Sequence, residues 1–260
     1  MSEHINNIKI MTDTDNRQGA VVASDDAMSF CRGEGMKISI IIPVLHEEQT
    51  IAPTLETLSR LTPDEIIVVD GGSTDRTREI VQRTLAKCIV APRGRAQQMN
   101  AGAHAATGDV LLFLHADTRL PPSALTDVRT ALGDLRCVGG RFDVKLDCEE
   151  WMFRLIGTLM NVRSRLTKIA TGDQAIFVRR GVFEEIGGFP DLPLMEDVAF
   201  SRLLKKRGRI ACLRRHVVTS ARRWEKEGVW QTILKMWTLR FLFFTGVSPL
   251  HFRRFYDDAR

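Results

Sequence analysis

Short runs of apolar residues alternate along the chain with longer segments in which apolar residues recur every three or four positions. The run at residues 37–44 reads KISIIIPV, which is rich in β-branched residues and closes around a proline. Runs of this kind predict buried strands, whereas the wider spacing predicts amphipathic helices. The first half of the chain is therefore expected to contain strands at residues 37–44, 65–70, 88–92 and 109–115, with helices at 48–60, about 74–85 and 95–106.

After residue 120 the order of elements becomes less regular. Ser73 or Thr74 is the expected N-cap of the second helix. In the later part, prolines open the helix at 121–132 and Gly208 ends the helix at 195–208. Residues 228–245 are apolar and aromatic, yet they carry Lys235 and Arg240 and fall short of the roughly 20 apolar residues that a membrane span needs. The remaining expected elements are strands at 138–146, 173–180 and 209–214 and helices at 121–132, 148–168 and 195–208.

Three consecutive strand–helix–strand units predict an α/β fold with a mostly parallel sheet that is covered by helices on both faces. In such sheets ligands bind outside the carboxyl ends of the strands. Pro43, Asp70 and Asp117 all lie at those ends. The sequence therefore predicts one ligand site built from three separate regions of the chain.

Composition and net charge limit the kinds of partner and the cellular compartment that the protein is expected to have. The 260 residues carry a net charge of +5, which favours an anionic partner and leaves nucleic acid, a phosphorylated substrate and a membrane surface open. Five scattered cysteines without a CxxC pair favour neither a zinc site nor a disulfide framework, so a reducing cytosol is expected. The expected organisation is a loosely ordered leader (1–35), a main domain (36–225) and a C-terminal amphipathic helical segment (226–260).

The two strand-end carboxylates each have two interpretations. Asp70, in VVDGGSTD, suits a contact with a nucleobase or a ribose hydroxyl, but Asp-Gly is also common turn chemistry. Asp117, in LHADT, suits Mg²⁺ or Mn²⁺ bridging a nucleotide diphosphate, with His115 on ribose, phosphate or the metal. The alternative is a turn-capping aspartate beside a packed histidine.

Two helix starts carry further candidates. Arg93 and Arg95 lie where a guanidinium and a helix N-terminus could seat a diphosphate, although a solvated basic loop fits equally well. Glu196 and Asp197 begin a helix, where carboxylates are favoured by the helix dipole but could also act as a general base.

The order of the motifs resembles that of the family 2 glycosyltransferases. A strand that ends in proline with a glutamate soon after is followed by VVDGGSTD, GRAQQMNAG, LHADT, TGDQAIFVRR and GGFPDLPLMEDVAF, over residues 37–224. The chain looks most similar to small bacterial members with a His-Ala-Asp metal motif, some of which are linked to arsenosugar biosynthesis. The resemblance implies a GT-A fold, a nucleotide-diphospho-sugar donor (UDP-sugar favoured), Mg²⁺ or Mn²⁺, and inversion at the anomeric carbon.

On the donor side, the resemblance implies a role for each matching residue. Pro43, Val44 and Glu47 would line the base and ribose pocket, Asp70 would contact the base, and Arg95 would lie near the diphosphate. His115, Ala116 and Asp117 would form the metal motif. Asp117 stands where the metal-binding aspartate is found, whereas His115 replaces the first aspartate of the family's DxD pattern.

On the acceptor side, Gly172 and Asp173 match the acceptor loop, and Asp197 matches the catalytic base. Glu196 would orient the acceptor or its loop. Trp224 closes SARRW, which aligns with the QxxRW signature of processive synthases, but serine stands in place of glutamine. A single transfer per encounter is therefore expected, to a hydroxyl of a small-molecule or lipid-linked acceptor.

The C-terminal segment has two interpretations. An apolar aromatic face with basic residues suits the inner face of an anionic membrane, so this interpretation predicts a cytoplasmic protein that is peripheral on the cell membrane. A helix packed on the catalytic domain or on a dimer partner is the alternative. The residues at three-to-four spacing are Trp230, Ile233, Leu234, Trp237, Phe241 and Phe244.

Other functions have less support. A non-catalytic nucleotide-sugar-binding module on a degenerate transferase fold is suggested by His115 but opposed by Asp117 and Asp197. A nucleotidyltransferase would need a glycine-rich, arginine-containing loop directly after the first strand, and PVLHEEQT lacks it. Nucleic-acid binding rests on net charge only and is not expected.

Overall fold

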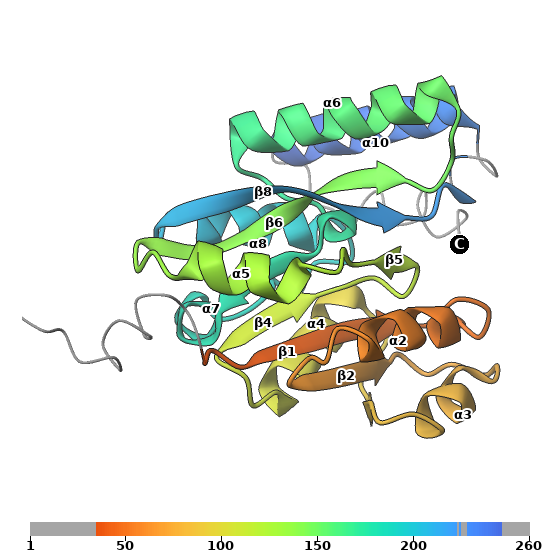
Figure 1. Ribbon diagram of the computed structural model, residues 1–260. Coiled ribbons are helices and arrows are strands. Elements are labelled where there is room, and N and C mark those ends of the chain that lie inside the picture. The colour runs from red at the N-terminus through yellow and green to blue at the C-terminus, as the bar shows by residue number, and fades with distance from the viewer. Residues whose placement is uncertain (1–34, 223, 225–227, 246–260) are drawn as a thin grey trace, which may run out of the picture.

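The first half of the chain builds the parallel part of an eight-stranded sheet (Figure 1). The computed structural model describes residues 35–222, 224 and 228–245, so the predicted leader lies outside the described residues except for its last residue. β1 pairs in parallel with β2 and β4, and β2 pairs in parallel with β3. The elements are β1 (Ile38–Val44), α2 (Ile51–Ser59), β2 (Glu65–Asp70), α3 (Thr77–Gln82), β3 (Lys87–Val90), α4 (Arg95–Ala105) and β4 (Val110–Phe113).

The second half extends the sheet in mixed directions, in the order β3-β2-β1-β4-β7-β6-β8-β5. β7 runs antiparallel to β4 and β6, β5 runs antiparallel to β8, and β6 is parallel to β8. The predicted α/β class with a mostly parallel sheet is confirmed. The elements are β5 (Thr118–Arg119), α5 (Ala124–Leu132), β6 (Cys137–Leu146), α6 (Trp151–Thr167), η1 (Gly172–Gln174), β7 (Ile176–Arg179), α7 (Arg180–Ile186), α8 (Glu196–Leu204), β8 (Arg209–Thr219) and α10 (Val229–Phe244).

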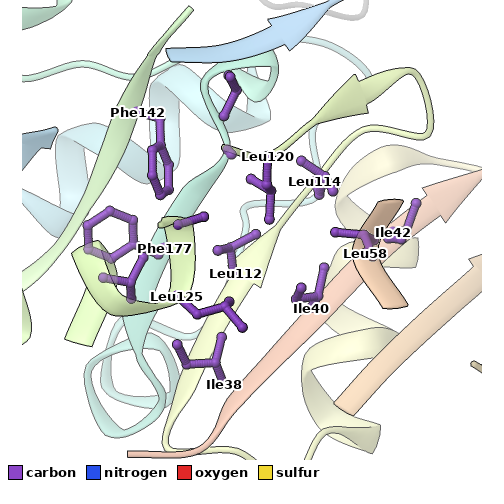
Figure 2. Close-up of a cluster of buried hydrophobic side chains, with 14 of the residues drawn as sticks. Ile38, Ile40, Ile42, Leu58, Leu112, Leu114, Leu120, Leu125, Phe142 and Phe177 are labelled. Carbon is purple, nitrogen blue, oxygen red and sulfur yellow. The ribbon is translucent and has the colours of Figure 1, made fainter. Parts of the chain in front are cut away.

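Two apolar clusters cover the two faces of the sheet, because strand side chains alternate between faces. Ile40 and Ile42 of β1 join the cluster under α2 and α5, which Figure 2 shows around Leu112 and Phe177. Ile41 points to the other face and joins the cluster under α4, α7 and α8. The continuous apolar strands seen in the sequence are therefore explained by burial on both sides.

Several boundaries differ from those predicted from sequence. α3 begins at Thr77, because the Asp75 carboxylate accepts the Thr77 N–H at 3.0 Å. The predicted cap is wrong: Ser73 instead accepts the His46 N–H through its hydroxyl at 2.9 Å. β8 continues to Thr219, where its pairing with Thr118 forms the unpredicted short strand β5.

α10 packs on the domain through one face and leaves its other face open. Leu239 is buried with Met195 and Val198 of the segment that begins α8, and Val229 packs near Phe153 of α6. In the part of the chain that the structure describes, no helix has the length and apolarity that a membrane crossing requires. The open face of α10 consists of Trp230, Leu234, Trp237, Phe241 and Phe244, each more than half exposed.

Candidate active site

The carboxyl ends of β1 and β2 form the donor-side rim. Asp70 ends β2 fully buried, and its carboxylate accepts the backbone N–H groups of Gly72 and Ser73 at 3.1 Å. Asp70 therefore stabilises the turn after β2, which is one of the two roles that the sequence allowed. Val44 is buried at the end of β1, and its carbonyl accepts the Gly71 N–H at 3.0 Å, so the two strand ends are joined directly.

A glutamine that sequence reasoning missed holds this rim together. The Gln98 side chain, on α4, donates to the carbonyls of Val44 and Val69, each at 2.8 Å. α4 can approach the sheet closely because it carries Gly102, where a Cβ would lie 2.4 Å from Cγ2 of Ile41. The small residues of this helix were the signal that it packs tightly, but they did not identify the buried glutamine.

Pro43 and Glu47 lie where the chain leaves β1. Pro43 is partly buried, and the Glu47 carboxylate accepts the Thr50 hydroxyl at 2.6 Å. Glu47 also lies 3.8 Å from the guanidinium of Arg222, so the loop before α2 meets the segment after β8. These contacts bring the far end of the domain to the predicted base and ribose pocket.

The His115–Asp117 motif follows β4 at the same edge of the sheet. Ala116 is buried, and its carbonyl accepts the Thr54 hydroxyl at 2.5 Å, which fixes the motif against α2. Asp117 is partly exposed, and the Thr118 hydroxyl lies 3.4 Å from its Oδ1. His115 packs against Gly172, where an added Cβ would lie only 2.5 Å from the imidazole Nε2. The donor motif and the acceptor loop are thus in contact.

Asp197 lies at the first turn of α8 and faces the acceptor loop. Its Oδ2 accepts the Gly172 N–H and its Oδ1 accepts its own helix's Val198 N–H, both at 2.7 Å. Burial raises the pKa of the Asp197 carboxyl, and the negative charge of Asp173 raises that pKa further. The two backbone hydrogen bonds and the positive charge of Arg95 oppose the increase in pKa. The carboxylate therefore accepts a first-turn N–H of α8 and also holds the loop that contains Gly172.

A small cavity brings the donor-side and acceptor-side candidates together. Arg95, at the start of α4, is close enough for its charge to act on Asp197. Glu196 is buried at the cavity wall beside Asp197. The lining residues are Pro43, Met99, Phe113, Leu114, His115, Gly172, Ile176, Phe189, Glu196 and Asp197.

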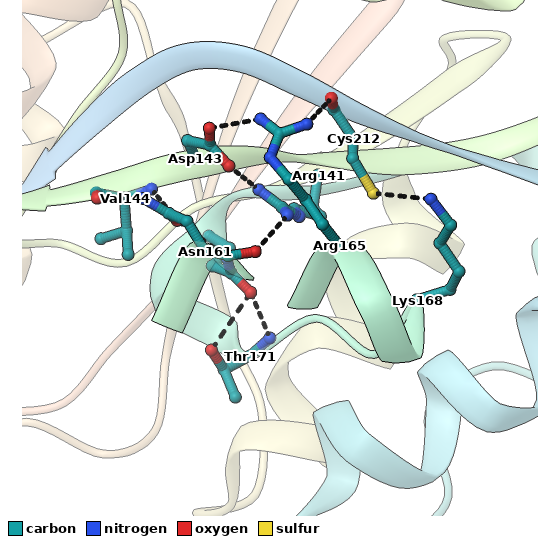
Figure 3. Close-up of polar contacts among 9 residues, drawn as sticks. Arg141, Asp143, Val144, Asn161, Arg165, Lys168, Thr171 and Cys212 are labelled. Carbon is teal, nitrogen blue, oxygen red and sulfur yellow. Dashed lines mark hydrogen bonds and ion pairs between the residues drawn. The ribbon is translucent and has the colours of Figure 1, made fainter. Parts of the chain in front are cut away.

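A buried polar network fixes the acceptor loop from behind (Figure 3). Gln174 closes the turn through Thr171, and its amide lies 3.5 Å from the Asn161 side chain on α6. Asn161 in turn bonds both backbone groups of Val144 on β6 at 2.8 and 2.9 Å. Asp143 pairs with two arginines of this network, Arg141 and Arg165. The position of Asp173 therefore depends on the packing of α6 on β6.

Trp224 lies apart from the lining of the cavity. The indole packs with Phe153 and Ile156 of α6 and with Ala221, in an apolar cluster beneath that helix. The neighbouring Arg222 contacts Glu47 on the donor side. The assignment of Trp224 to the acceptor side stays a prediction.

The residues present fit a divalent metal that arrives together with a nucleotide. Among the residues that the structure describes, no group of three or more His, Cys, Asp or Glu side chains is arranged to hold a metal ion. Asp117 is partly exposed and makes one long hydroxyl contact, so its carboxylate has lone pairs for a ligand. Hard cations such as Mg²⁺ take few carboxylates when phosphate oxygens complete their shell.

Comparisons with known proteins identify the family. Residues 39–187, which make up more than half of the chain, match Glycosyl transferase family 2. The chain is 33% identical over 164 residues to a PGL/p-HBAD biosynthesis glycosyltransferase of Mycobacterium bovis, covering 58% of this chain and 62% of the relative. It is 28% identical over 195 residues to the probable glycosyltransferase YdaM of Bacillus subtilis, covering 62% of this chain and 44% of the relative. The matches therefore span less than two thirds of these relatives.

Solved structures confirm the GT-A type of fold. The TarS structure of S. aureus superposes with a TM-score of 0.57 at 21% identity, covering 71% of this chain and 37% of that one. The mannosyltransferase PcManGT of Pyrobaculum calidifontis, in complex with GDP-Man and Mn²⁺, gives 0.55 at 22% identity, covering 70% and 56%. The chain therefore belongs to glycosyltransferase family 2.

Proposed function

We propose that the protein transfers one sugar, with inversion, from a UDP-sugar to an acceptor hydroxyl and requires Mg²⁺ or Mn²⁺. The observation that carries the proposal is the Asp197 carboxyl, which lies in one cavity with His115 of the donor motif and Gly172 of the acceptor loop. A base that lies between donor and acceptor residues is what a direct displacement needs.

Asp197 acts as the general base. The acceptor oxygen attacks the anomeric carbon from the face opposite the diphosphate, the bond to the diphosphate oxygen breaks, and the acceptor proton passes to Asp197. Because the pKa of this carboxyl is raised, it holds a proton more readily than an exposed aspartate would. Its hydrogen bond from Gly172 fixes it against the acceptor loop, and Glu196 beside it orients that loop.

The donor side seats the nucleotide at the strand ends. Pro43, Val44 and Glu47 line the base and ribose pocket, and the turn that Asp70 fixes forms its floor. Arg95 faces the diphosphate. When bound at Asp117, the divalent metal supplies positive charge that stabilises the leaving diphosphate.

Two features support the choice of donor and subgroup. UDP is favoured because the related TarS structure was determined in complex with UDP-GlcNAc and the related glucosyl-3-phosphoglycerate synthase with UDP and Mn²⁺. The His115–Ala116–Asp117 form of the metal motif supports placing the chain with the arsenosugar-associated members of the family. Ser220, in place of glutamine, supports a single transfer.

We also propose that the protein contacts the cytoplasmic face of an anionic membrane. α6, which runs alongside α10 (Figure 1), also carries an exposed apolar stripe, and we call the two together the α6–α10 surface. Single exposed apolar side chains are ordinary, whereas a contiguous apolar patch marks an interaction site. Lys235 on α10 adds positive charge of the kind that anionic lipids attract. The α6 stripe consists of Trp151, Leu155, Leu159, Val162 and Leu166, between 47% and 79% exposed.

Liposome co-sedimentation tests the membrane contact with a matched pair of variants. Leu234, on the α6–α10 surface, and Leu135, outside it, are each 70% exposed. Leu234→Ser should weaken binding to phosphatidylglycerol vesicles, and Leu135→Ser should not. Equal binding of the two variants, or no binding by the unaltered protein at low salt, would remove the membrane proposal and favour a protein partner for this surface.

Donor hydrolysis and product stereochemistry test the proposed reaction. The full chain should release UDP from a UDP-sugar in the presence of Mn²⁺. This release should stop when a chelator is added. Proton NMR of the first product should show an anomeric configuration opposite to that of the donor. Retention of configuration would exclude the single displacement, and binding without any turnover would favour the non-catalytic module.

A further inference from the structure

Two arginines on neighbouring helices lie within range of the charges of Asp173 and Asp197. Arg163 belongs to α6 and Arg240 to α10, which run alongside each other (Figure 1) and pack together where Val229 meets Phe153. Arg163 and Arg240 are close enough for their charges to act on one another. The charges of Asp173 and Asp197 act on both guanidiniums. Leu239, next to Arg240, packs on Met195 and Val198 on either side of the Glu196–Asp197 pair, so the arginines lie near the proposed base.

Some polar atoms of Arg163 and Asp173 are buried without a hydrogen-bond partner. Nε and Nη2 of Arg163 are buried without a hydrogen-bond partner, and so is Oδ1 of Asp173. A buried charged donor without a partner is costly, by more than a neutral group would be. Burial, followed by the charge of Arg240, lowers the pKa of Arg163 to about 10. Burial likewise lowers the pKa of Arg240.

These features distinguish the pair from the other arginines of α6. Arg165 on the same helix pairs with Asp143, and Arg154 pairs with Glu149 at 2.7 Å. Arg163 keeps unpaired donors beside a second cation, and an anion that accepts from both guanidiniums would offset their mutual repulsion. Each guanidinium offers five N–H donors in a planar fork, which matches the oxygens of a phosphate group.

We propose that Arg163 and Arg240 bind a phosphate group of the acceptor and so hold its hydroxyl toward Asp197. This inference rests on the proposed function, because it names the chemistry of the acceptor for the same reaction. The phosphate belongs to the acceptor rather than to the donor, since the arginines lie on α6 and α10, whereas Arg95 lies at the start of α4 near the strand ends. Two planar guanidiniums also suit the several oxygens of a phosphate group better than a single carboxylate.

The phosphate could be part of a soluble ester or of a lipid headgroup. α6 and α10 carry both the arginines and the exposed α6–α10 surface, so a headgroup could enter from a membrane on that side. A soluble phosphate ester would enter from water. The binding chemistry is the same in both cases, and two probes separate the sources.

Calorimetry on the full chain tests the inference with glycerol 3-phosphate as the soluble probe and phosphatidylglycerol vesicles as the lipid probe. Each is titrated with and without UDP and Mn²⁺, and phosphatidylcholine vesicles serve as the neutral lipid control. One probe should bind, and Arg163→Leu or Arg240→Leu should weaken its binding about tenfold or more. Arg154→Leu removes the same charge from an exposed pair on α6 and should change binding little. Lysine at position 163 should restore part of the affinity.

The outcomes separate this inference from the proposed function. Affinity for UDP should stay unchanged in the Arg163 and Arg240 variants; a loss of UDP affinity would assign the arginines to the donor and overturn the inference. If neither probe binds, or if Arg154→Leu weakens binding as much as Arg163→Leu, the inference is wrong even where the donor binds normally. If Arg163→Leu fails to fold, Arg240→Leu gives the same comparison with Arg154→Leu. Failure of the unaltered protein to bind UDP contradicts the proposed function instead, while the titrations without nucleotide still decide the phosphate site.

Discussion

A single methyl group added at Gly172 should disturb both sides of the site. The Cβ of Gly172→Ala would lie 2.5 Å from Nε2 and 2.9 Å from Cε1 of His115, well inside van der Waals contact. The imidazole must therefore turn away or the loop must shift, and overpacking of this kind costs about 1–3 kcal/mol. For a chain of this size, the melting temperature should fall by about 2–12 °C. The hydrogen bond from Gly172 to Asp197 should weaken with it.

A double-mutant cycle identifies the cause of this loss. His115→Ala removes the ring, so the variant with both substitutions should recover most of the stability that Gly172→Ala loses. Gly181→Ala is the control, because a Cβ there meets nothing within 4 Å. Scanning calorimetry of the five proteins gives the coupling energy. If the effects of Gly172→Ala and His115→Ala add within about 0.5 kcal/mol, the imidazole does not pack on Gly172 and the contact between donor motif and acceptor loop is wrong.

Two further predictions concern proton and metal binding. Turnover should rise with pH through the raised pKa of Asp197, because only its deprotonated carboxylate accepts a proton. The same raised pKa means that the folded state loses stability as pH increases above the unfolded pKa, so Asp197→Asn should be at least as stable as the unaltered protein at pH 7, as thermal unfolding would show. Asp117→Asn should abolish the effect of Mn²⁺ on UDP binding in calorimetry, whereas His115→Ala should weaken that binding less; unchanged Mn²⁺ dependence in Asp117→Asn would leave Asp117 a turn residue.

The sequence predicts the strands well because burial on both faces leaves an unmistakable apolar run. Residues 37–44 and 65–70 become β1 and β2 almost as predicted. Helix starts are less accurate, since they depend on contacts between distant loops: the hydroxyl of Thr77 accepts the Glu47 N–H at 2.8 Å, which no local pattern reveals. The antiparallel direction of β7 is likewise decided by the turn at η1 and by pairing with β4.

The candidate site is only partly predictable for the same reason. Motif order identifies residues at strand ends and helix starts. These positions come together at one edge of the sheet because the carboxyl ends of parallel strands meet there. Gln98, Arg163 and Arg240 lie within helices and were not selected, because a polar residue in an amphipathic segment is usually solvated. Their importance comes from the packing of α4, α6 and α10, which is a property of the tertiary structure. The assignment of individual roles stays a prediction.

The turnover of Asp197→Asn tests the central claim most directly. General-base catalysis contributes about 10²- to 10⁴-fold, so the variant should lose roughly that factor while UDP-sugar affinity stays nearly unchanged. Asp127→Asn is the matched control: Asp127 also lies in a helix first turn and accepts the Ser123 hydroxyl at 2.7 Å, but α5 does not line the cavity. Since asparagine also caps helices well, a role limited to capping predicts that both variants keep full activity. Near-normal turnover of Asp197→Asn would contradict the mechanism and move the base to Glu196 or Asp173.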